Sequence, residues 1–208
     1  MTPERSAAMI DVGFTLDGGS LPRDHRGALA DAVECALPWL VGLQGAGLHR
    51  LNFCPGDATD LLLSRRTRLR LRVPRERAGD AAALEGRDLQ AGSKCVRIGA
   101  ARTRELLPHT TLYAPMVVAE GIDGSDDEAD FLRAMQLELA ALEVVCRPIC
   151  GRRQIVEGAP VQGFSLMLDG LTVEHSLRVL ETGLGAQRRL GCGLFNAHRS
   201  AVAVGVSP

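Results

Sequence analysis

The sequence near the end of the chain reads Glu181-Thr-Gly-Leu-Gly-Ala-Gln-Arg-Arg-Leu-Gly-Cys-Gly-Leu-Phe195. Glycines lack a Cβ atom, so their backbone can adopt positive φ angles and bring N–H groups close to a bound phosphate. Two arginines, Arg188 and Arg189, stand between the glycine pairs, where their guanidinium groups would complete a phosphate cradle. This composition predicts a polyanion site formed by Gly183, Gly185, Arg188, Arg189, Gly191 and Gly193. The alternative is a helix C-cap at Gly183 followed by an ordinary loop.

Two better-known glycine motifs do not fit this stretch. A Rossmann fingerprint follows a strand and opens a helix, whereas residues 172–182 have helical spacing and residues 194–204 have the pattern of a strand. The sequence also lacks G-x-x-x-x-G-K-[ST], which excludes a P-loop. The glycine stretch therefore requires a different interpretation.

The order helix, Gly-Leu-Gly, five residues, Gly-Cys-Gly-Leu-Phe, strand resembles the C-terminal glycine-rich loop of the RAMP superfamily of CRISPR-associated RNA-binding proteins. Within it, the chain is similar to the Myxan-subtype endoribonucleases that cut precursor CRISPR RNA within its repeats. The same resemblance is found in Leu21-Pro-Arg-Asp-His25 with Ala28-Leu29, in Gly47-Leu-His-Arg-Leu, in Arg65 to Val73 and in Leu112-Tyr113-Ala114. It implies two tandem ferredoxin-like (RRM-like) domains, with the glycine loop of the second one holding repeat RNA.

Hydrophobic periodicity independently predicts an α+β fold in two similar halves. Apolar residues alternate in residues 10–16, 61–73 and 162–168, as in half-buried strands, and recur with helical spacing in residues 28–40 and 131–142. With strands at 48–54, 89–98, 110–118 and 144–155 and helices at 75–84 and 172–182, each half reads β-α-β-β-α-β, the ferredoxin-like order. A break near residues 100–108 places the expected domains at residues 1–102 and 103–208.

One predicted strand carries an unusual ladder of arginines. Arg66, Arg68, Arg70 and Arg72 alternate with Thr67, Leu69, Leu71 and Val73, so the arginines share one face. Charged side chains usually lie on a solvated surface. However, four arginines without an acidic residue among them favour binding of an RNA backbone.

RNA cleavage without a metal requires a base for the 2′-hydroxyl, an acid for the 5′-oxygen and positive charge at the phosphate. Histidine can perform either proton transfer. His25 is predicted at the first turn of a helix, where the positive end of the dipole favours the neutral imidazole that a base requires. The resemblance implies that His25 is the catalytic residue, and the alternative is a surface histidine at the start of a helix. Arg23 and Arg26 lie beside His25 in the sequence, where they could contact the scissile phosphate.

The acid stays unassigned, although His49 on the second predicted strand is a candidate. A packed strand residue is the equal alternative for His49, and His109 is a weaker candidate for catalysis. His175 and His198 show no partner in the pattern. The sequence contains no H-E-x-x-H, G-x-S-x-G or paired-carboxylate motif that would predict another reaction.

Composition limits the remaining possibilities. The 208 residues have a formal net charge of −1, so any RNA site must be a local patch of arginines. No run of 18 apolar residues and no secretory signal is present, and the six scattered cysteines suit a reducing compartment. We therefore expect a soluble cytoplasmic protein without a membrane partner, and we expect neither a metal nor a cofactor.

These features predict a metal-independent endoribonuclease that cuts CRISPR repeat RNA by 2′-hydroxyl attack, leaving a 2′,3′-cyclic phosphate. The expected partners are precursor and mature guide RNA, and the resemblance adds subunits of a type I effector complex in antiviral defence. The alternative is a non-catalytic RAMP subunit that only binds guide RNA. A third possibility, a ferredoxin-like fold that binds a small molecule or protein, leaves the arginines and the glycine loop unexplained.

Overall fold

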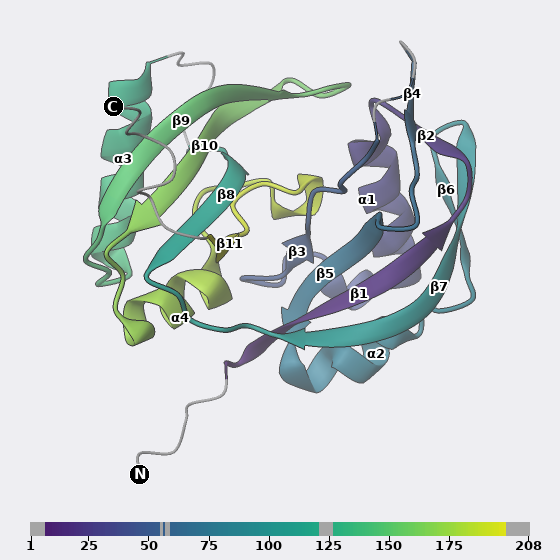
Figure 1. Ribbon diagram of the computed structural model, residues 1–208, viewed down its shortest axis with the longest axis horizontal. Helices are drawn as coiled ribbons and strands as arrows, with labels where there is room; N and C mark the ends of the chain where they lie inside the picture. Colours follow the sequence, from purple (N-terminus) through teal and green to yellow (C-terminus); the bar gives the residue numbers. More distant parts are fainter. Residues whose placement is uncertain (1–6, 55, 57–58, 121–126, 199–208) are drawn as a thin grey trace, which may run out of the picture.

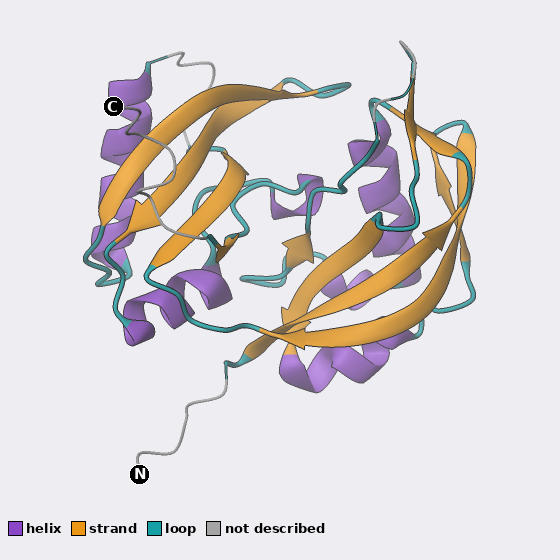
Figure 2. Ribbon diagram, in the orientation of Figure 1, coloured by secondary structure: helices purple, strands orange, loops and turns teal. Residues whose placement is uncertain are grey.

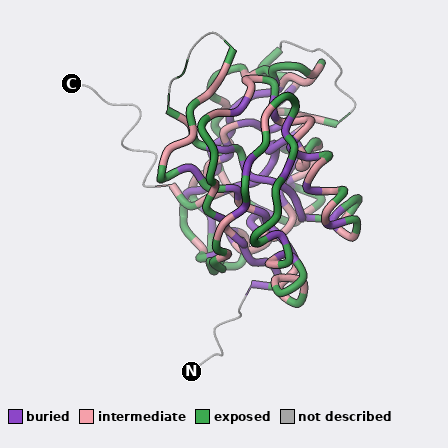
Figure 3. The backbone as a smooth tube through the Cα atoms, turned by 90° about the vertical axis from the view of Figure 1, so that its right-hand side faces the viewer, coloured by how far each residue is buried: buried purple, intermediate pink, exposed green. Residues whose placement is uncertain are grey.

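The computed structural model describes residues 7–54, 56, 59–120 and 127–198. These residues form two main antiparallel sheets, one in each half of the chain, and the glycine-rich segment lies between them (Figure 1). Helices α1 and α2 accompany the first sheet, and α3 and α4 accompany the second (Figure 2). The buried parts of the backbone run through the middle of the molecule, and the outer turns are exposed (Figure 3).

The N-terminal half contains a five-stranded sheet with the order β3-β5-β1-β7-β6. Its elements are β1 (Met9–Asp17), β2 (Ser20–Pro22), α1 (His25–Ala36), η1 (Pro38–Leu40), β3 (Gly47–Leu48), β4 (Asp60–Leu62), β5 (Arg68–Pro74), η2 (Arg75–Arg77), α2 (Ala78–Ala82), β6 (Asp88–Ala91) and β7 (Lys94–Glu105). The strands β1, β3, β5 and β7 follow the β-α-β-β-α-β order, and β6 adds an edge to β7. The short strands β2 and β4 pair with each other in a separate two-stranded antiparallel sheet.

The C-terminal half repeats this arrangement in a four-stranded sheet with the order β11-β8-β10-β9. Its elements are β8 (Thr111–Val117), α3 (Glu128–Ala141), β9 (Arg147–Val156), β10 (Val161–Asp169), α4 (Val173–Thr182), η3 (Arg188–Leu190) and β11 (Asn196–Ala197). In both halves the first and third principal strands occupy the middle of the sheet. The α+β fold and the repeated order of elements are as predicted.

Alternation along β1 explains the two faces of the first sheet. Ile10, Val12 and Phe14 are buried in the hydrophobic core, and their partners in β5 are Val73, Leu71 and Leu69. The intervening residues point to the other face, where Asp11 lies opposite Arg72. This polar face turns toward the C-terminal half, because Arg72 bonds to two of its carbonyl groups.

Several predicted boundaries differ from the structure. The single strand expected over residues 61–73 is divided into β4 and β5, because a turn intervenes in which the Thr67 hydroxyl donates to the Asn52 carbonyl oxygen. The strand expected over 48–54 is reduced to β3 at its start, and the one over 89–98 is the hairpin of β6 and β7. The last strand, expected over 194–204, is β11, and its positions after 198 lie outside the described residues.

Residues 106–110 connect β7 with β8. The strand β7 therefore passes the expected boundary between residues 102 and 103, and the division into two separate domains stays a proposal. Among the described helices, none is long and apolar enough to cross a membrane.

Candidate active site

The glycine-rich loop is packed inside the molecule, between the two sheets. All four of its glycines have positive φ angles, between 67° and 81°, and all four are buried. A Cβ atom at Gly183, Gly185 or Gly193 would overlap a backbone carbonyl oxygen, and one at Gly191 would lie 3.0 Å from the backbone nitrogen of Arg50. These positions require glycine because the chain approaches itself and the N-terminal half too closely for a side chain.

The amide groups of these glycines are already bonded. Gly183 donates to the Val179 carbonyl at 2.9 Å, Gly191 to Arg188 at 3.2 Å and Gly193 to Met116 at 2.8 Å. Gly185 donates to a carboxylate oxygen of Glu138 at 2.6 Å. The prediction that these N–H groups face a phosphate is therefore wrong, and the glycines serve close packing of the loop.

The two arginines of the loop also bind protein groups. Arg188 donates to the carbonyl oxygens of Thr182 at 3.1 Å and Gly185 at 2.6 Å, which ties the loop to the end of α4. Arg189 forms ion pairs with Glu34 and Asp31 of α1 in the N-terminal half. The Arg188 guanidinium thus holds the loop to its own half, and that of Arg189 joins the two halves. RNA binding by either arginine stays a prediction.

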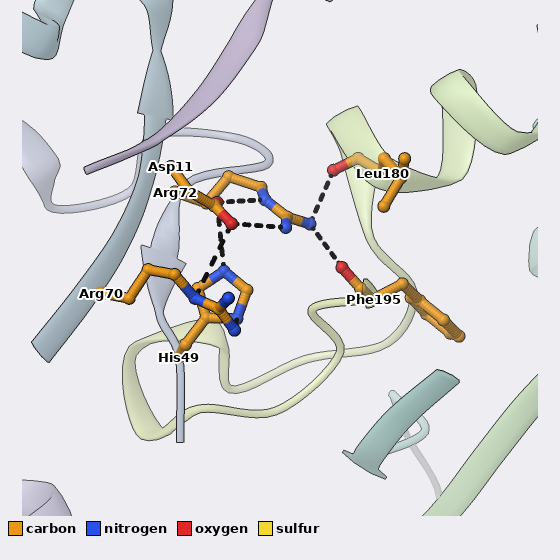
Figure 4. Close-up of polar contacts among 6 residues, drawn as sticks. All are labelled: Asp11, His49, Arg70, Arg72, Leu180 and Phe195. Atoms are coloured by element: carbon orange, nitrogen blue, oxygen red, sulfur yellow. Dashed lines mark hydrogen bonds and ion pairs between the residues drawn. The ribbon is translucent and has the colours of Figure 1, made fainter. Parts of the chain in front are cut away.

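A buried ionic cluster joins the halves next to this loop (Figure 4). We call its four side chains the interface network: Asp11, His49, Arg70 and Arg72. Arg72 donates to both carboxylate oxygens of Asp11, at 2.9 and 3.2 Å. Its third bonding nitrogen, Nη1, donates to the carbonyl oxygens of Leu180 at 2.9 Å and Phe195 at 3.0 Å. One arginine therefore neutralises a buried acid and satisfies carbonyl groups on both sides of the glycine loop.

The arginine ladder passes from solvent into the interior. Arg66 lies in a turn before β5, and Arg68 is exposed and donates to the backbone oxygens of Arg65 and Thr67. Arg70 is half-buried, whereas Arg72 is 1% exposed. The prediction of an exposed RNA-binding face is wrong for Arg72, because the C-terminal half covers this end of the strand. RNA binding by the other three arginines stays a prediction.

His49 is held by partners at both ring nitrogens. Its Nε2 donates to Asp11 at 3.2 Å, and its Nδ1 accepts from Arg70 at 3.0 Å, so the neutral Nε2–H tautomer satisfies both contacts. Burial lowers the pKa of His49 to about 4. The charges of Arg72 and Arg70 lower it further, whereas the carboxylate of Asp11 acts in the opposite direction and raises it. Two roles were expected for His49, a packed structural residue or the general acid, and these contacts favour the structural one.

His25 is the first residue of α1. Asp24 occupies the N-cap position without a side-chain cap bond. The His25 Nδ1 donates to the Pro22 carbonyl oxygen at 2.7 Å, which places the lone pair of the neutral ring on Nε2. Phe53 packs against the ring with centroids 4.8 Å apart and planes 72° apart. Burial lowers the pKa of His25, so the ring is neutral and competent as a base.

A cavity of about 560 Å³ adjoins His25, and we call it the His25 pocket. Its polar lining residues are Arg23, His25, Arg26, Arg50, Asn52 and Glu157, and its apolar lining includes Phe53 and Ile155. Arg26 donates to the Leu190 carbonyl oxygen at 3.4 Å and so links α1 to the glycine loop. The pocket thus combines a neutral imidazole with several cations, the groups that RNA transesterification requires.

Sequence reasoning missed Arg50 and Glu157. The side chain of Arg50 is exposed and forms no hydrogen bond or ion pair within the described part of the chain. It also lines a second cavity, of about 520 Å³, together with Arg70, Arg104 and His109. The only signal for Arg50 was its place beside His49, and nothing in the local pattern connects Glu157 to His25.

Comparisons with known proteins agree with this fold. The model of the family described as Cas6 Crispr matches residues 10–200. The chain is 37% identical over 188 residues to the CRISPR-associated endonuclease Cas6 of Myxococcus xanthus, covering 89% of this chain and 80% of that protein.

Solved structures show the same architecture at low sequence identity. One, described as an RAMP protein binding different RNA substrates, has a TM-score of 0.62 at 15% identity and covers 91% of this chain and 100% of its own. A Cas6-related protein from Pyrococcus furiosus has a TM-score of 0.60 at 13% identity, covering 90% of this chain and 98% of that one.

Proposed function

The chain belongs to the Cas6 family, and on this basis we propose that it is an endoribonuclease that cuts precursor CRISPR RNA within its repeats. The relative from Myxococcus xanthus, which is named an endonuclease, matches most of both chains and supports this activity. The observation that carries the proposal is the His25 pocket, in which a neutral histidine lies with Arg50, an arginine that has no hydrogen bond or ion pair among the described residues.

In the proposed reaction, the Nε2 atom of His25 takes the proton of the 2′-hydroxyl beside the cut. The 2′-oxygen then forms a bond with phosphorus while the bond to the 5′-oxygen breaks. The products are a 2′,3′-cyclic phosphate and a 5′-hydroxyl, and the leaving oxygen takes a proton from an acid that stays unassigned. Every step uses proton transfer and electrostatics, so the proposal requires no metal ion.

Arg50 supplies the positive charge on the scissile phosphate in this proposal. A cation stabilises the developing charge best when no protein carboxylate neutralises it beforehand. Arg26 is committed in part to the Leu190 carbonyl, and its pKa is lowered by burial and by the repulsion of Arg50. We therefore assign the phosphate first to Arg50, with Arg23 and Arg26 at neighbouring positions of the RNA.

The test is single-turnover cleavage of labelled repeat RNA in EDTA. We expect His25→Ala to reduce the rate by about 100- to 10,000-fold without loss of RNA binding, because the base is removed. The matched control is His175→Ala in α4, a histidine that lines neither cavity. A single 2′-deoxy nucleotide at the cut must also abolish cleavage, because it removes the nucleophile.

The same assay decides the alternative function. Binding of repeat RNA without cutting by the wild type would make this chain a guide-RNA-binding subunit. Cutting that survives His25→Ala would move the base to another residue. Retention of the product RNA after cutting, measured by gel filtration, would support assembly into an effector complex.

A further inference from the structure

The turn between β9 and β10, residues 157–160, reaches from the C-terminal half to the start of α1. The hairpin extends across the molecule toward that helix (Figure 1). Gly158 has a φ angle of 79°, and a Cβ atom there would lie 2.6 Å from the Cβ of Asp24, the residue before His25. The close approach fixes the turn beside the proposed catalytic histidine.

Glu157, the first residue of this turn, places a carboxylate in the His25 pocket. It lies near enough to Arg26 to raise the pKa of that arginine, against the larger effects of burial and of Arg50. Glu157 is exposed, and within the described residues its side chain forms no hydrogen bond or ion pair. The pocket therefore contains one acid whose hydrogen-bonding capacity is unused.

An ionised carboxylate accepts hydrogen bonds and repels phosphate. Its partner on an RNA must accordingly be an N–H group of a base or a hydroxyl. Ile155, in β9, lies two residues before Glu157, lines the same pocket and is 61% exposed. An apolar surface beside an acceptor matches a base, whose face is apolar and whose edge carries donors.

Guanine is the base whose Watson–Crick edge presents two adjacent donors, N1–H and the N2 amino group. A carboxylate has two acceptor oxygens and can bind both donors at once. The other bases present at that edge a single donor group next to acceptors, which the carboxylate would repel.

We propose that Glu157 recognises a guanine next to the cut, with Ile155 against the face of the base. This inference rests on the proposed function, because it takes the His25 pocket as the place of the scissile phosphate. It makes Glu157 a specificity-determining residue contributed by the half of the molecule that does not contain His25.

The test uses the repeat RNA of the CRISPR array encoded with this protein, with each guanine replaced in turn by inosine, which lacks the N2 amino group. Dissociation constants are measured in a His25→Ala background, with Glu157 or with Glu157→Gln, so that binding is recorded whether or not the RNA is cut. Single-turnover rates are measured with His25 intact. Glu76→Gln, an exposed acid outside the pocket, is the matched control.

We expect inosine at one position to weaken binding by Glu157 proteins by about tenfold, the usual scale for a lost base contact. Glu157→Gln should lose about as much with guanine and should no longer distinguish inosine. Equal sensitivity of both proteins to every inosine would overturn the proposal. So would a uniform gain in affinity for all RNAs, since Glu157 would then only repel phosphates. A wild type that binds but does not cut contradicts the proposed cleavage, while the binding data still decide the role of Glu157.

Discussion

Two clusters, each with a histidine, arginines and an acid, lie next to the glycine loop, and they differ in how their charges are paired. In the interface network, His49 and Arg72 contact Asp11, and the carbonyl groups of Leu180 and Phe195 use the remaining capacity of Arg72. In the His25 pocket, Arg50 and Glu157 have no hydrogen bond or ion pair in the described structure. Residue type alone therefore does not distinguish a structural cluster from a reactive one.

This difference predicts that the two clusters respond to mutation in separate measurements. Groups satisfied by the protein contribute to folding, and their removal leaves buried partners without compensation. Groups left open to a ligand contribute to binding or chemistry, and their removal should leave the fold intact. Three experiments test this division.

Arg72→Met should produce the largest effect on stability. The substitution leaves Asp11 as an uncompensated buried charge and removes a donor from two carbonyl groups, so we expect a loss of about 3–5 kcal/mol in the free energy of unfolding. Urea unfolding measures it. Arg68→Met, on the same strand but exposed, is the control and should change stability by less than about 0.5 kcal/mol. A loss for Arg72→Met no larger than the control's would show that the interface network is not structural.

The arginine ladder also shows what sequence reasoning could reach. Alternation correctly placed Arg68, Arg70 and Arg72 on one face of a strand, because that period is local. Whether these arginines are buried or exposed depends on Asp11, which is 61 residues from Arg72 in the sequence, and on the C-terminal half, which covers only one end of the strand. No pattern within the strand contains that information, so the burial of Arg72 was not predictable.

The glycine loop and the His25 pocket carry the same lesson. The spacing of the glycines correctly indicated positive φ angles, which are a property of each residue. Whether their amides face a ligand depends on acceptors such as Glu138 and Met116 from other elements. The start of a helix at His25 was predicted correctly, and its catalytic role, predicted from that place and from the family resemblance, stays a proposal. Arg50 and Glu157 join His25 only in the folded chain.

Arg50→Ala tests the His25 pocket, the cluster whose charged groups are not paired within the described residues. Removing the cation from the phosphate should lower the single-turnover cleavage rate by about 100- to 1,000-fold, the usual effect of losing one transition-state donor. Stability should change by less than about 0.5 kcal/mol, because the side chain has no protein partner in the described residues.

Two further variants serve as a charge-retaining comparison and a control for that experiment. Arg50→Lys should restore part of the rate, since it keeps the charge without the planar fork. Arg87→Ala, an exposed arginine that lines neither cavity, is the matched control. An Arg50→Ala protein that cuts normally but unfolds more easily would reverse the assignment of the two clusters.

The pH dependence of stability is the smallest of the three effects. The ordinary pKa of a histidine is 6.5, and in the folded protein burial lowers that of His49 to about 4. Between these values the unfolded chain binds more protons than the folded one, so stability rises with pH. The expected slope is at most about 1.4 kcal/mol per pH unit for one histidine. His25 contributes in the same direction, because burial lowers its pKa as well. The contribution of Asp11, whose pKa is also lowered despite its burial, is lost only at more acidic pH, below 3.8.

Urea midpoints recorded from pH 4.5 to 7.5 measure this slope. His49→Gln is the informative variant, because an amide can donate to Asp11 and accept from Arg70 as the neutral ring does, but it cannot take a proton in this range. The variant should retain only the part of the slope that other groups contribute, such as His25. An unchanged slope would mean that His49 has the same pKa in the folded and the unfolded state, so that burial does not lower it. In that case His49 would not be a purely structural residue, and it would again be a candidate for the general acid.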